Sequence, residues 1–319
     1  MASAQERSGE PLTTVLAQLG LAPATFYRWC WRAEEGQLAD RLVAPQRRVL
    51  LPTPEEVAAV CAFALQYSAL GYKRLTWAMV DRDLACLRPY QVYRILQERQ
   101  LLRRRPQPPV EALPRPPAAE RPDQVWHVDL MYVYVPPRWY YLVDILDAYS
   151  RFLVHWSLNL TMTADTVTLT VQQALDTLAH RRDNEPKIVH DHGSQFLSQE
   201  WRTFIEGARV TDIKTRVAHP ESNGLLERLH RTHREEGLIG AEAADYYQAL
   251  EDMASWGHYY NHERPHSALG CLYPADYYRG DPASRLAERE RKLSEALSQR
   301  ILYWKAYANV KEQHRPLHQ

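Results

Sequence analysis

The stretch DQVWHVDLMYVYV, residues 123–135, combines β-branched and aromatic residues in a run that is typical of a strand. Two similar runs follow, YYLVDILDAY at 140–149 and RFLVHWSLN at 151–159, and only short turn segments separate the three. Strands joined by such short connections pair in antiparallel fashion. The chain therefore predicts three consecutive antiparallel strands that begin near residue 123.

The sequence after these strands alternates between helical and strand patterns. Apolar residues at helical spacing predict a helix over 164–180, and EPKIVHDHGSQF, residues 185–196, predicts a short strand that ends at Asp191 in a glycine turn. A helix over 198–208, a short strand at 212–215 and a further helix follow. This order predicts a mixed sheet with helices on its faces.

Three acidic residues are notable because of the elements that carry them. Asp129 lies between apolar neighbours in the first strand, where an unpaired carboxylate is unfavourable. Asp191 ends another strand, and Glu227 lies one turn into the helix of HPESNGLLERLH, residues 219–230. Three carboxylates from separate elements supply the oxygen ligands that two Mg²⁺ or Mn²⁺ ions require, and such a pair acts on phosphodiesters. We therefore expect Asp129, Asp191 and Glu227 to be catalytic metal ligands.

The helix that carries Glu227 also has basic residues on the same stripe. His230, Arg231 and Arg234 follow Glu227 at spacings of three, four and seven residues. A surface ion pair from Glu227 to Arg231 is the simpler interpretation of the stripe taken alone. The two strand acids favour a metal ligand at Glu227, which leaves Arg231 and Arg234 as candidates for DNA contacts.

The N-terminal part predicts a helix-turn-helix. LTTVLAQLGLAPATFYRWCWR, residues 12–32, contains two short helical patterns about Gly20, and Arg28 and Arg32 would lie on the second helix, where DNA is contacted. A helical hairpin that packs only against itself is the alternative.

A second helical module is predicted over 54–102, with Pro89 in the first turn of its last helix. Two tandem helical modules with basic residues indicate a protein that reads a long DNA site. The residues of this module expected to contact DNA are Lys73, Arg74 and Arg94.

The segment that follows the second module is rich in proline and arginine. It comprises residues 103–122, RRRPQPPVEALPRPPAAERP, with seven prolines and five arginines, and so predicts an extended spacer. This spacer either only links domains or also binds along the DNA phosphates through Arg103, Arg104 and Arg105.

The predicted parts of the chain are a helix-turn-helix at 1–45, a second DNA-binding module at 46–102, the linker at 103–122, a catalytic core at 123–240 and a C-terminal helical region at 241–319. The last helix of that region is expected to be largely solvated, with one apolar seam that could bind a partner or a second copy.

Composition limits the other classes of function. The 319 residues are 45% hydrophobic, no long apolar run or secretory signal is present, and the four cysteines form no C-x-x-C pair. We therefore expect a cytoplasmic protein without a cysteine metal site. Net charge is zero, but residues 1–110 carry 15 Lys and Arg against 10 Asp and Glu, whereas the remainder carries 24 against 29. No phosphate-binding GxxxxGK[ST] motif is present, so no nucleotide cofactor is expected.

These motifs, taken together, resemble a known family. WHVDL, HDHGSQF and HPESNGLLERLHRTHR, with 35 residues between the second and third acids, are similar to the catalytic core of the retroviral-integrase superfamily in bacterial insertion-sequence transposases. YYNHERPHSALGCLYPADYY, residues 259–278, resembles the segment that follows that core. The resemblance implies an RNase H-like fold, a DDE triad of Asp129, Asp191 and Glu227, and contact of Arg234 with the terminal DNA of the element.

The resemblance also implies an activity and partners. A transposase binds terminal inverted repeats, cleaves a strand to free a 3′ hydroxyl and transfers that end to target DNA. A homo-oligomer, dimer or tetramer, acting at the bacterial nucleoid is expected, without a membrane partner. Two alternatives stay open, namely a domesticated DNA-binding protein without cutting activity and an integrase that acts on DNA already excised.

Several other residues near the motifs receive structural interpretations. Asp144 and Asp147 are expected to be turn or edge residues. His190 and His192 are expected to have structural or substrate-contact roles rather than to bind zinc. His127 shares a strand face with Asp129, so it is expected near the metal site without an assigned role. His266 is expected to pack in a loop or to face DNA.

Overall fold

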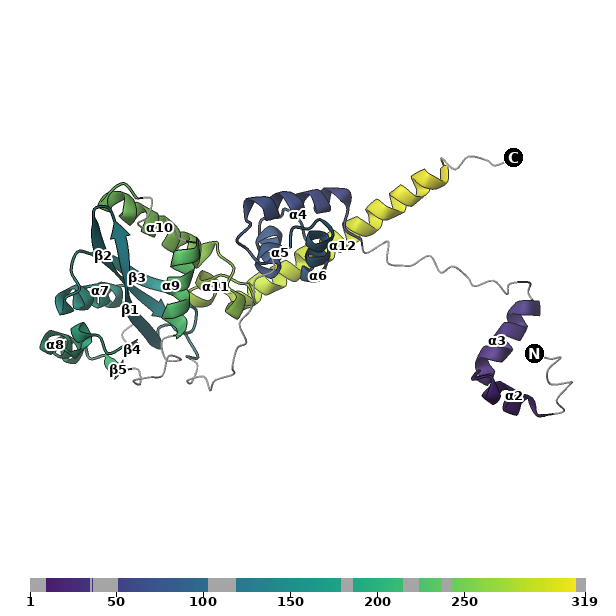
Figure 1. Ribbon diagram of the computed structural model, residues 1–319, viewed down its shortest axis with the longest axis horizontal. Coiled ribbons are helices and arrows are strands. Elements are labelled where there is room, and N and C mark those ends of the chain that lie inside the picture. Colours follow the sequence, from purple (N-terminus) through teal and green to yellow (C-terminus); the bar gives the residue numbers. More distant parts are fainter. Residues whose placement is uncertain are drawn as a thin grey trace. The chain divides into compact units, whose positions relative to one another are not determined.

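The computed structural model describes residues 10–34, 36, 51–102, 119–178, 186–214, 224–236 and 243–313, with side chains of the last helix described to residue 308. Contacts divide the chain into two units, Met1–Leu50 and Leu51–Gln319, which are described separately (Figure 1). No helix within the described ranges is both long and apolar enough to cross a membrane. The domain boundaries predicted after residues 45 and 240, and the predicted DNA contacts Arg103, Arg104 and Arg105, lie outside the described residues.

The first unit contains two helices joined by a glycine turn. Helix α2, Leu12–Gln18, is followed by helix α3, Pro23–Glu34. Gly20 lies between them with φ +67°, a left-handed conformation that glycine adopts without steric strain. The amide of Leu21 donates a hydrogen bond to the carbonyl of Leu16, which closes the end of α2. The predicted pair of helices about a glycine turn is confirmed.

The second unit begins with a three-helix module formed by α4, Pro54–Gln66, α5, Tyr72–Asp81, and α6, Pro89–Glu98. Thr53 and Glu56 form a capping box at the start of α4, in which each side chain accepts a hydrogen bond from the other's backbone N–H. The three helices share one apolar core, which includes Val60, Phe63, Leu75, Met79, Val92 and Ile95. The predicted second helical module is confirmed.

A five-stranded sheet follows, with the strand order β3-β2-β1-β4-β5. Its strands are β1, Val125–Val135, β2, Arg138–Asp147, β3, Leu153–Asn159, β4, Lys187–His190, and β5, Thr211–Lys214. The first three strands pair in antiparallel fashion, whereas β4 is parallel to β1 and β5 is parallel to β4. The predicted mixed five-stranded sheet is confirmed.

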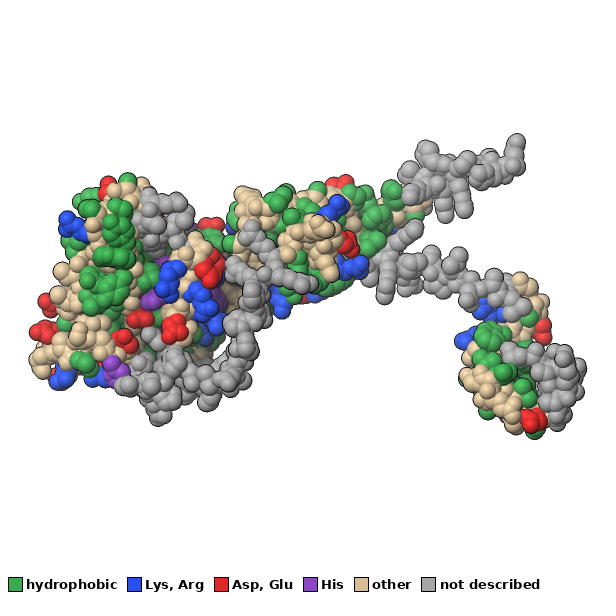
Figure 2. Space-filling model, viewed as in Figure 1, with side chains coloured by type: hydrophobic (Ala, Val, Ile, Leu, Met, Phe, Trp, Pro, Cys, Tyr) green, Lys and Arg blue, Asp and Glu red, His purple; other side chains and the backbone are tan. Residues whose placement is uncertain are grey.

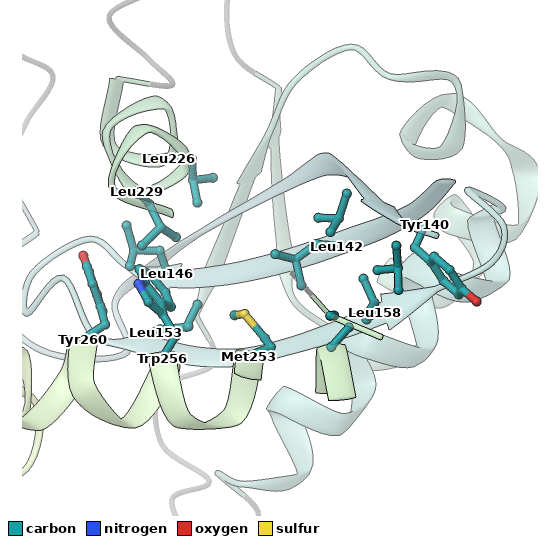
Figure 3. Packing of buried hydrophobic residues seen from close by; sticks show 14 residues of the cluster. Tyr140, Leu142, Leu146, Leu153, Leu158, Leu226, Leu229, Met253, Trp256 and Tyr260 are labelled. Atoms are coloured by element: carbon teal, nitrogen blue, oxygen red, sulfur yellow. The ribbon is translucent and has the colours of Figure 1, made fainter. Parts of the chain in front are cut away.

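Successive residues of each strand point to opposite faces of the sheet. Helices cover both of these faces. Helices α7, Ala164–Asp176, and α8, Gln199–Ala208, pack with Trp126 and the other inward residues of one face. Helices α9, Gly224–Glu236, and α10, Tyr246–His262, cover the opposite face. Figure 3 shows this second core, in which side chains of β2, β3, α9 and α10 meet, including Leu142, Leu146, Leu153, Leu158, Leu226, Leu229, Met253 and Trp256.

The chain after α10 returns to the three-helix module through η4, Ser267–Leu269, α11, Pro274–Tyr278, and α12, Pro282–Gln313. On α12, Arg289 binds Asp81 and Arg300 binds Glu56, and both guanidinium groups are buried. Leu293 between them is also buried. The predicted largely solvated helix with one seam is confirmed for the described side chains of α12, but the seam is not purely apolar, because carboxylates of the three-helix module enclose two of its arginines.

Candidate active site

Two of the predicted ligands come from neighbouring strands of the sheet. β1 and β4 are parallel, and His127 lies opposite Val189 at the last pair of their ladder. Asp129 lies on β1 two residues after this pair, and Asp191, which directly follows β4, also lies two residues after it. Adjacent strands are about 4.8 Å apart, and residues in register on a sheet project to the same face. Asp129 and Asp191 therefore lie equally far along the chain from the last pair of the β1–β4 ladder.

Asp191 is held at the end of β4 by a turn and by a buried histidine. Its Oδ1 accepts a hydrogen bond of 2.8 Å from the N–H of Gly193. The ring of His190 is fully buried, with Nδ1 2.6 Å from the carbonyl oxygen of Asp191 and Nε2 2.6 Å from Oδ1 of Asp212. These contacts give His190 the structural role that was predicted, whereas His192 is exposed.

Glu227 comes from α9, which lies across the Asp129 face of the sheet. Leu226 and Leu229 of this helix are buried in the core that β1 and β2 line, whereas Glu227 is exposed in the first turn. His230, about one turn later, has Nδ1 3.9 Å from Oδ2 of Asp129. Glu227 therefore lies one helical turn from a residue that approaches Asp129.

The oxygen atoms of these acids are of the kind that a divalent cation prefers. The side chain of Asp129 is 15% exposed, and its Oδ1 accepts a hydrogen bond of 2.9 Å from the N–H of Leu130. Asp129 and Asp191 therefore fit a hard cation by their chemistry and by their neighbouring positions. Within the part of the chain that the structure describes, no three Asp, Glu, His or Cys side chains converge enough to hold a metal ion. Glu227 as the third ligand stays a prediction.

Asp144 also faces α9, and the sequence analysis did not identify it as part of the site. It pairs directly with Asp129 across β1 and β2 and is fully buried. Its Oδ2 lies 3.4 Å from Nε2 of His230 and 3.5 Å from Nε2 of His233, as ion-pair contacts rather than well-directed hydrogen bonds. The prediction of a turn or edge residue is wrong for Asp144, because β2 is an inner strand with helices on both faces.

The electrostatics of this cluster follow from its burial. Burial raises the pKa of Asp144, but the charges and contacts of His233 and His230 outweigh that effect and lower the pKa to about 2. Burial lowers the pKa of His230, whereas Asp144 and Asp129 raise it above its ordinary value overall. The sequence does contain a signal for this buried cluster. It is an acid inside the apolar run YYLVDIL, together with two histidines three residues apart on an amphipathic helix.

Asp147, by contrast, has the predicted turn role at the end of β2. Its Oδ2 accepts hydrogen bonds from the backbone N–H and the hydroxyl of Ser150, at 2.7 and 2.6 Å. Its Oδ1 accepts a further hydrogen bond of 2.9 Å from the N–H of Asp123. Asp147 therefore closes the β2–β3 turn and ties it to the residue that precedes β1.

Two further histidines are buried near arginines. His127 lies on the Asp129 face of β1, and burial together with the charge of Arg151 lowers its pKa to about 4. The pKa of His266, in the loop after α10, falls to about 3 through burial first and then through the charges of Arg264, Arg151, Arg228 and Arg74. Both rings are therefore neutral near pH 7 and add no positive charge there.

The residues predicted to contact DNA differ in their exposure. Those exposed to solvent are Arg28, Lys73, Arg94, Arg231 and Arg234, and Arg32 is partly exposed. Arg74 instead is 13% exposed, with Nη1 3.3 Å from a carboxylate oxygen of Glu236, which also binds Arg264. Figure 2 shows basic and acidic side chains next to one another on the surface over α9. The exposed residues are accessible to a phosphate backbone, whereas Arg74 connects the three-helix module to the end of α9.

Comparison with known proteins identifies the core. A family profile described as "Integrase core domain" matches residues 119–220, and a second profile of the same description matches residues 208–274. A 31 kDa protein of insertion element IS600 from Shigella sonnei, described as uncharacterized, is 28% identical over 162 residues, which are 50% of this chain and 58% of that protein. Transposase InsD for insertion element IS2D from Escherichia coli is 26% identical over 233 residues, which are 68% of this chain and 76% of that protein.

Among solved structures, the catalytic core domain of HTLV-2 integrase in complex with magnesium aligns with a TM-score of 0.41 and 18% identity, over 50% of this chain and 99% of that one. The profile matches extend from the segment before β1 to the start of α11 and so include the whole RNase H-like sheet and α9. The chain spans little more than half the length of the IS600 relative. Residues 119–274 therefore form an integrase core domain, and the chain is similar over 68% of its length to a transposase of an insertion element.

Proposed function

We propose that this protein binds the terminal inverted repeats of its element and cleaves and transfers DNA strands at a site formed by Asp129, Asp191 and Glu227. The observation that supports the proposal is that Asp129 on β1 and Asp191 directly after β4 each lie two residues beyond the last pair of the β1–β4 ladder, while α9 covers the Asp129 face. Two adjacent strand acids and one acid from a covering helix can bind the same ions from different sides.

The three acids are proposed to hold two Mg²⁺ or Mn²⁺ ions. Ions bound there would supply the positive charge that activates an attacking oxygen and stabilises a leaving oxygen in phosphoryl transfer. Asp129 and Asp191 would bind from the sheet and Glu227 from α9. The first reaction hydrolyses a strand at the end of the element, and the 3′ hydroxyl that it frees attacks the target strand.

Exposed basic residues are proposed to bind the DNA. Arg231 and Arg234 lie on the exposed side of α9, four and seven residues after Glu227, where they can bind phosphates next to the reacting strand. The helix-turn-helix and the three-helix module would read the element end through Arg28, Lys73 and Arg94. The joining of two ends requires at least two copies of the chain, so a homo-oligomer at the nucleoid is part of the proposal.

The test uses a labelled duplex that carries the DNA flanking the gene, incubated with the full chain and Mg²⁺. Asp191→Asn removes one charged ligand, and Asp176→Asn, at an exposed position of α7, is the matched control. We expect cleavage and joining by the native chain and by the control, and their loss in Asp191→Asn.

Two outcomes would replace the proposal by the alternatives. Sequence-specific binding without cleavage, in Mg²⁺ and in Mn²⁺, would indicate a DNA-binding protein that no longer cuts. Joining of pre-cut ends without cleavage of intact ends would indicate an integrase that acts on excised DNA.

A further inference from the structure

Asp144 occupies a position where the sheet is otherwise apolar. It pairs directly with Asp129 across β1 and β2, so the two side chains project from the same face at adjacent positions. Leu142 and Leu146, the neighbouring residues of β2 on this face, belong to the core in Figure 3. A carboxylate among such residues is stable only if charged or hydrogen-bonding groups compensate its burial.

Two histidines of α9 provide this compensation. His230 and His233 are three residues apart and therefore lie on the same side of the helix. Their Nε2 atoms lie 3.4 and 3.5 Å from Oδ2 of Asp144. The ring of His233 also stacks on Trp256, with the ring centroids 3.5 Å apart. All of these side chains are buried, so close packing restricts the rotamer of each.

His230 connects this buried acid to Asp129. Its Nε2 faces Asp144, whereas its Nδ1 lies 3.9 Å from Oδ2 of Asp129. The other oxygen of Asp129, Oδ1, accepts the hydrogen bond from Leu130. One oxygen of Asp129 is therefore oriented by the backbone, and the other faces a histidine that a buried carboxylate holds in place.

We propose that Asp144 and His230 are positioning residues: through His230, Asp144 sets the orientation of the Asp129 carboxylate and thereby its affinity for a divalent cation. This inference rests on the proposed function, in which Asp129 binds that cation. Groups that orient a metal ligand commonly change metal affinity by about 10- to 100-fold when they are altered. A cluster with only a structural role could be replaced by apolar side chains of similar volume without such an effect, since that exchange often stabilises a protein.

The test measures Mn²⁺ binding to the full chain by isothermal titration calorimetry. A triple variant, Asp144→Val with His230→Leu and His233→Phe, replaces the polar cluster by apolar packing, so we expect its thermal unfolding midpoint to equal or exceed the native one. We expect its dissociation constant for Mn²⁺ to rise by about 10- to 100-fold. Asp144→Asn, which keeps the shape of the side chain, should shift the same constant in the same direction and decides the question if the triple variant does not fold.

The outcomes separate this inference from the proposed function. Mn²⁺ binding of native strength by the folded triple variant, or by Asp144→Asn alone if the triple variant does not fold, would overturn the positioning role and leave the proposed function intact. Absence of Mn²⁺ binding by the native chain would overturn both. High Mn²⁺ concentrations should restore DNA cleavage in Asp144→Asn, because a positioning residue lowers the affinity for the cation rather than the maximal rate.

Discussion

Arg289 on α12 and Asp81 at the end of α5 form a two-pronged ion pair although 208 residues separate them in the sequence. Nε of Arg289 lies 2.8 Å from Oδ1, and Nη2 lies 2.7 Å from Oδ2, with side-chain exposures of only 1% and 7%. The hydroxyl of Tyr273 donates a further hydrogen bond of 2.8 Å to Asp81. The C-terminal helix is therefore attached to the three-helix module by a buried charge pair.

Removal of Arg289 should destabilise this attachment. Arg289→Ala leaves the carboxylate of Asp81 buried without its cation, a change that typically costs about 3–5 kcal/mol. Arg291→Ala is the matched control on the same helix, because Arg291 pairs with Glu288 and Glu295 at the surface. Urea unfolding of the three proteins measures the effect. Equal midpoints for the two variants would show that the buried pair contributes little.

Replacement of Glu227 should slow the chemistry strongly without unfolding the chain. Its side chain is exposed in the first turn of α9, so Glu227→Gln should leave the thermal midpoint unchanged. Loss of a metal ligand removes several kcal/mol of stabilisation from the transition state, so cleavage should slow by about 100-fold or more. Glu206→Gln, at an exposed position of α8, is the control. Native cleavage rates in Glu227→Gln would remove Glu227 from the proposed triad.

Arg234 should contribute one phosphate contact to DNA binding. Loss of one such contact weakens binding to every sequence alike and lowers the slope of log K against log salt by about 0.9. Binding of end DNA by Arg234→Ala is measured over a series of salt concentrations, with Arg202→Ala, exposed on α8, as the control. An unchanged slope in Arg234→Ala would mean that Arg234 faces solvent in the complex.

His266 should make stability depend on pH below neutrality. Its folded pKa of about 3 lies below the usual value of about 6.5, so the unfolded chain binds a proton first as the pH falls. The contribution of the neutral His266 ring to the free energy of unfolding is fully present above pH 6.5. It is lost as the pH falls toward 3, by up to about 1.4 kcal/mol per pH unit.

The measurement is urea unfolding of the native chain and of His266→Gln between pH 7 and pH 4. The variant should show a flatter decline, because glutamine does not titrate. His258→Gln, at an exposed position of α10, should keep the native decline. The charged groups that face His266 are arginines in both proteins, so they stay protonated over this range and do not contribute to the difference. Parallel pH profiles for the native chain and His266→Gln would contradict the assignment.

Local patterns in the sequence predicted the elements of the fold and the family motifs. The runs at 123–135, 140–149 and 151–159 correspond to β1, β2 and β3, because strand residues and short turns act over a few neighbouring positions. The same holds for the helix of the second module that was predicted to have Pro89 in its first turn, which is α6. The acids Asp129, Asp191 and Glu227 could be chosen from their elements alone, although their convergence on a metal ion stays a prediction.

The sequence by itself determined which segments form strands and helices and which motifs this chain shares with its relatives. Only the tertiary structure decided which charged residues are buried. Asp144 is enclosed by histidines of α9, and Arg289 by an acid of α5, and in both cases the partner lies far away in the chain. The physical reason is that a buried charge is stable only beside a specific partner, and no local pattern of spacing records which distant side chain that partner will be.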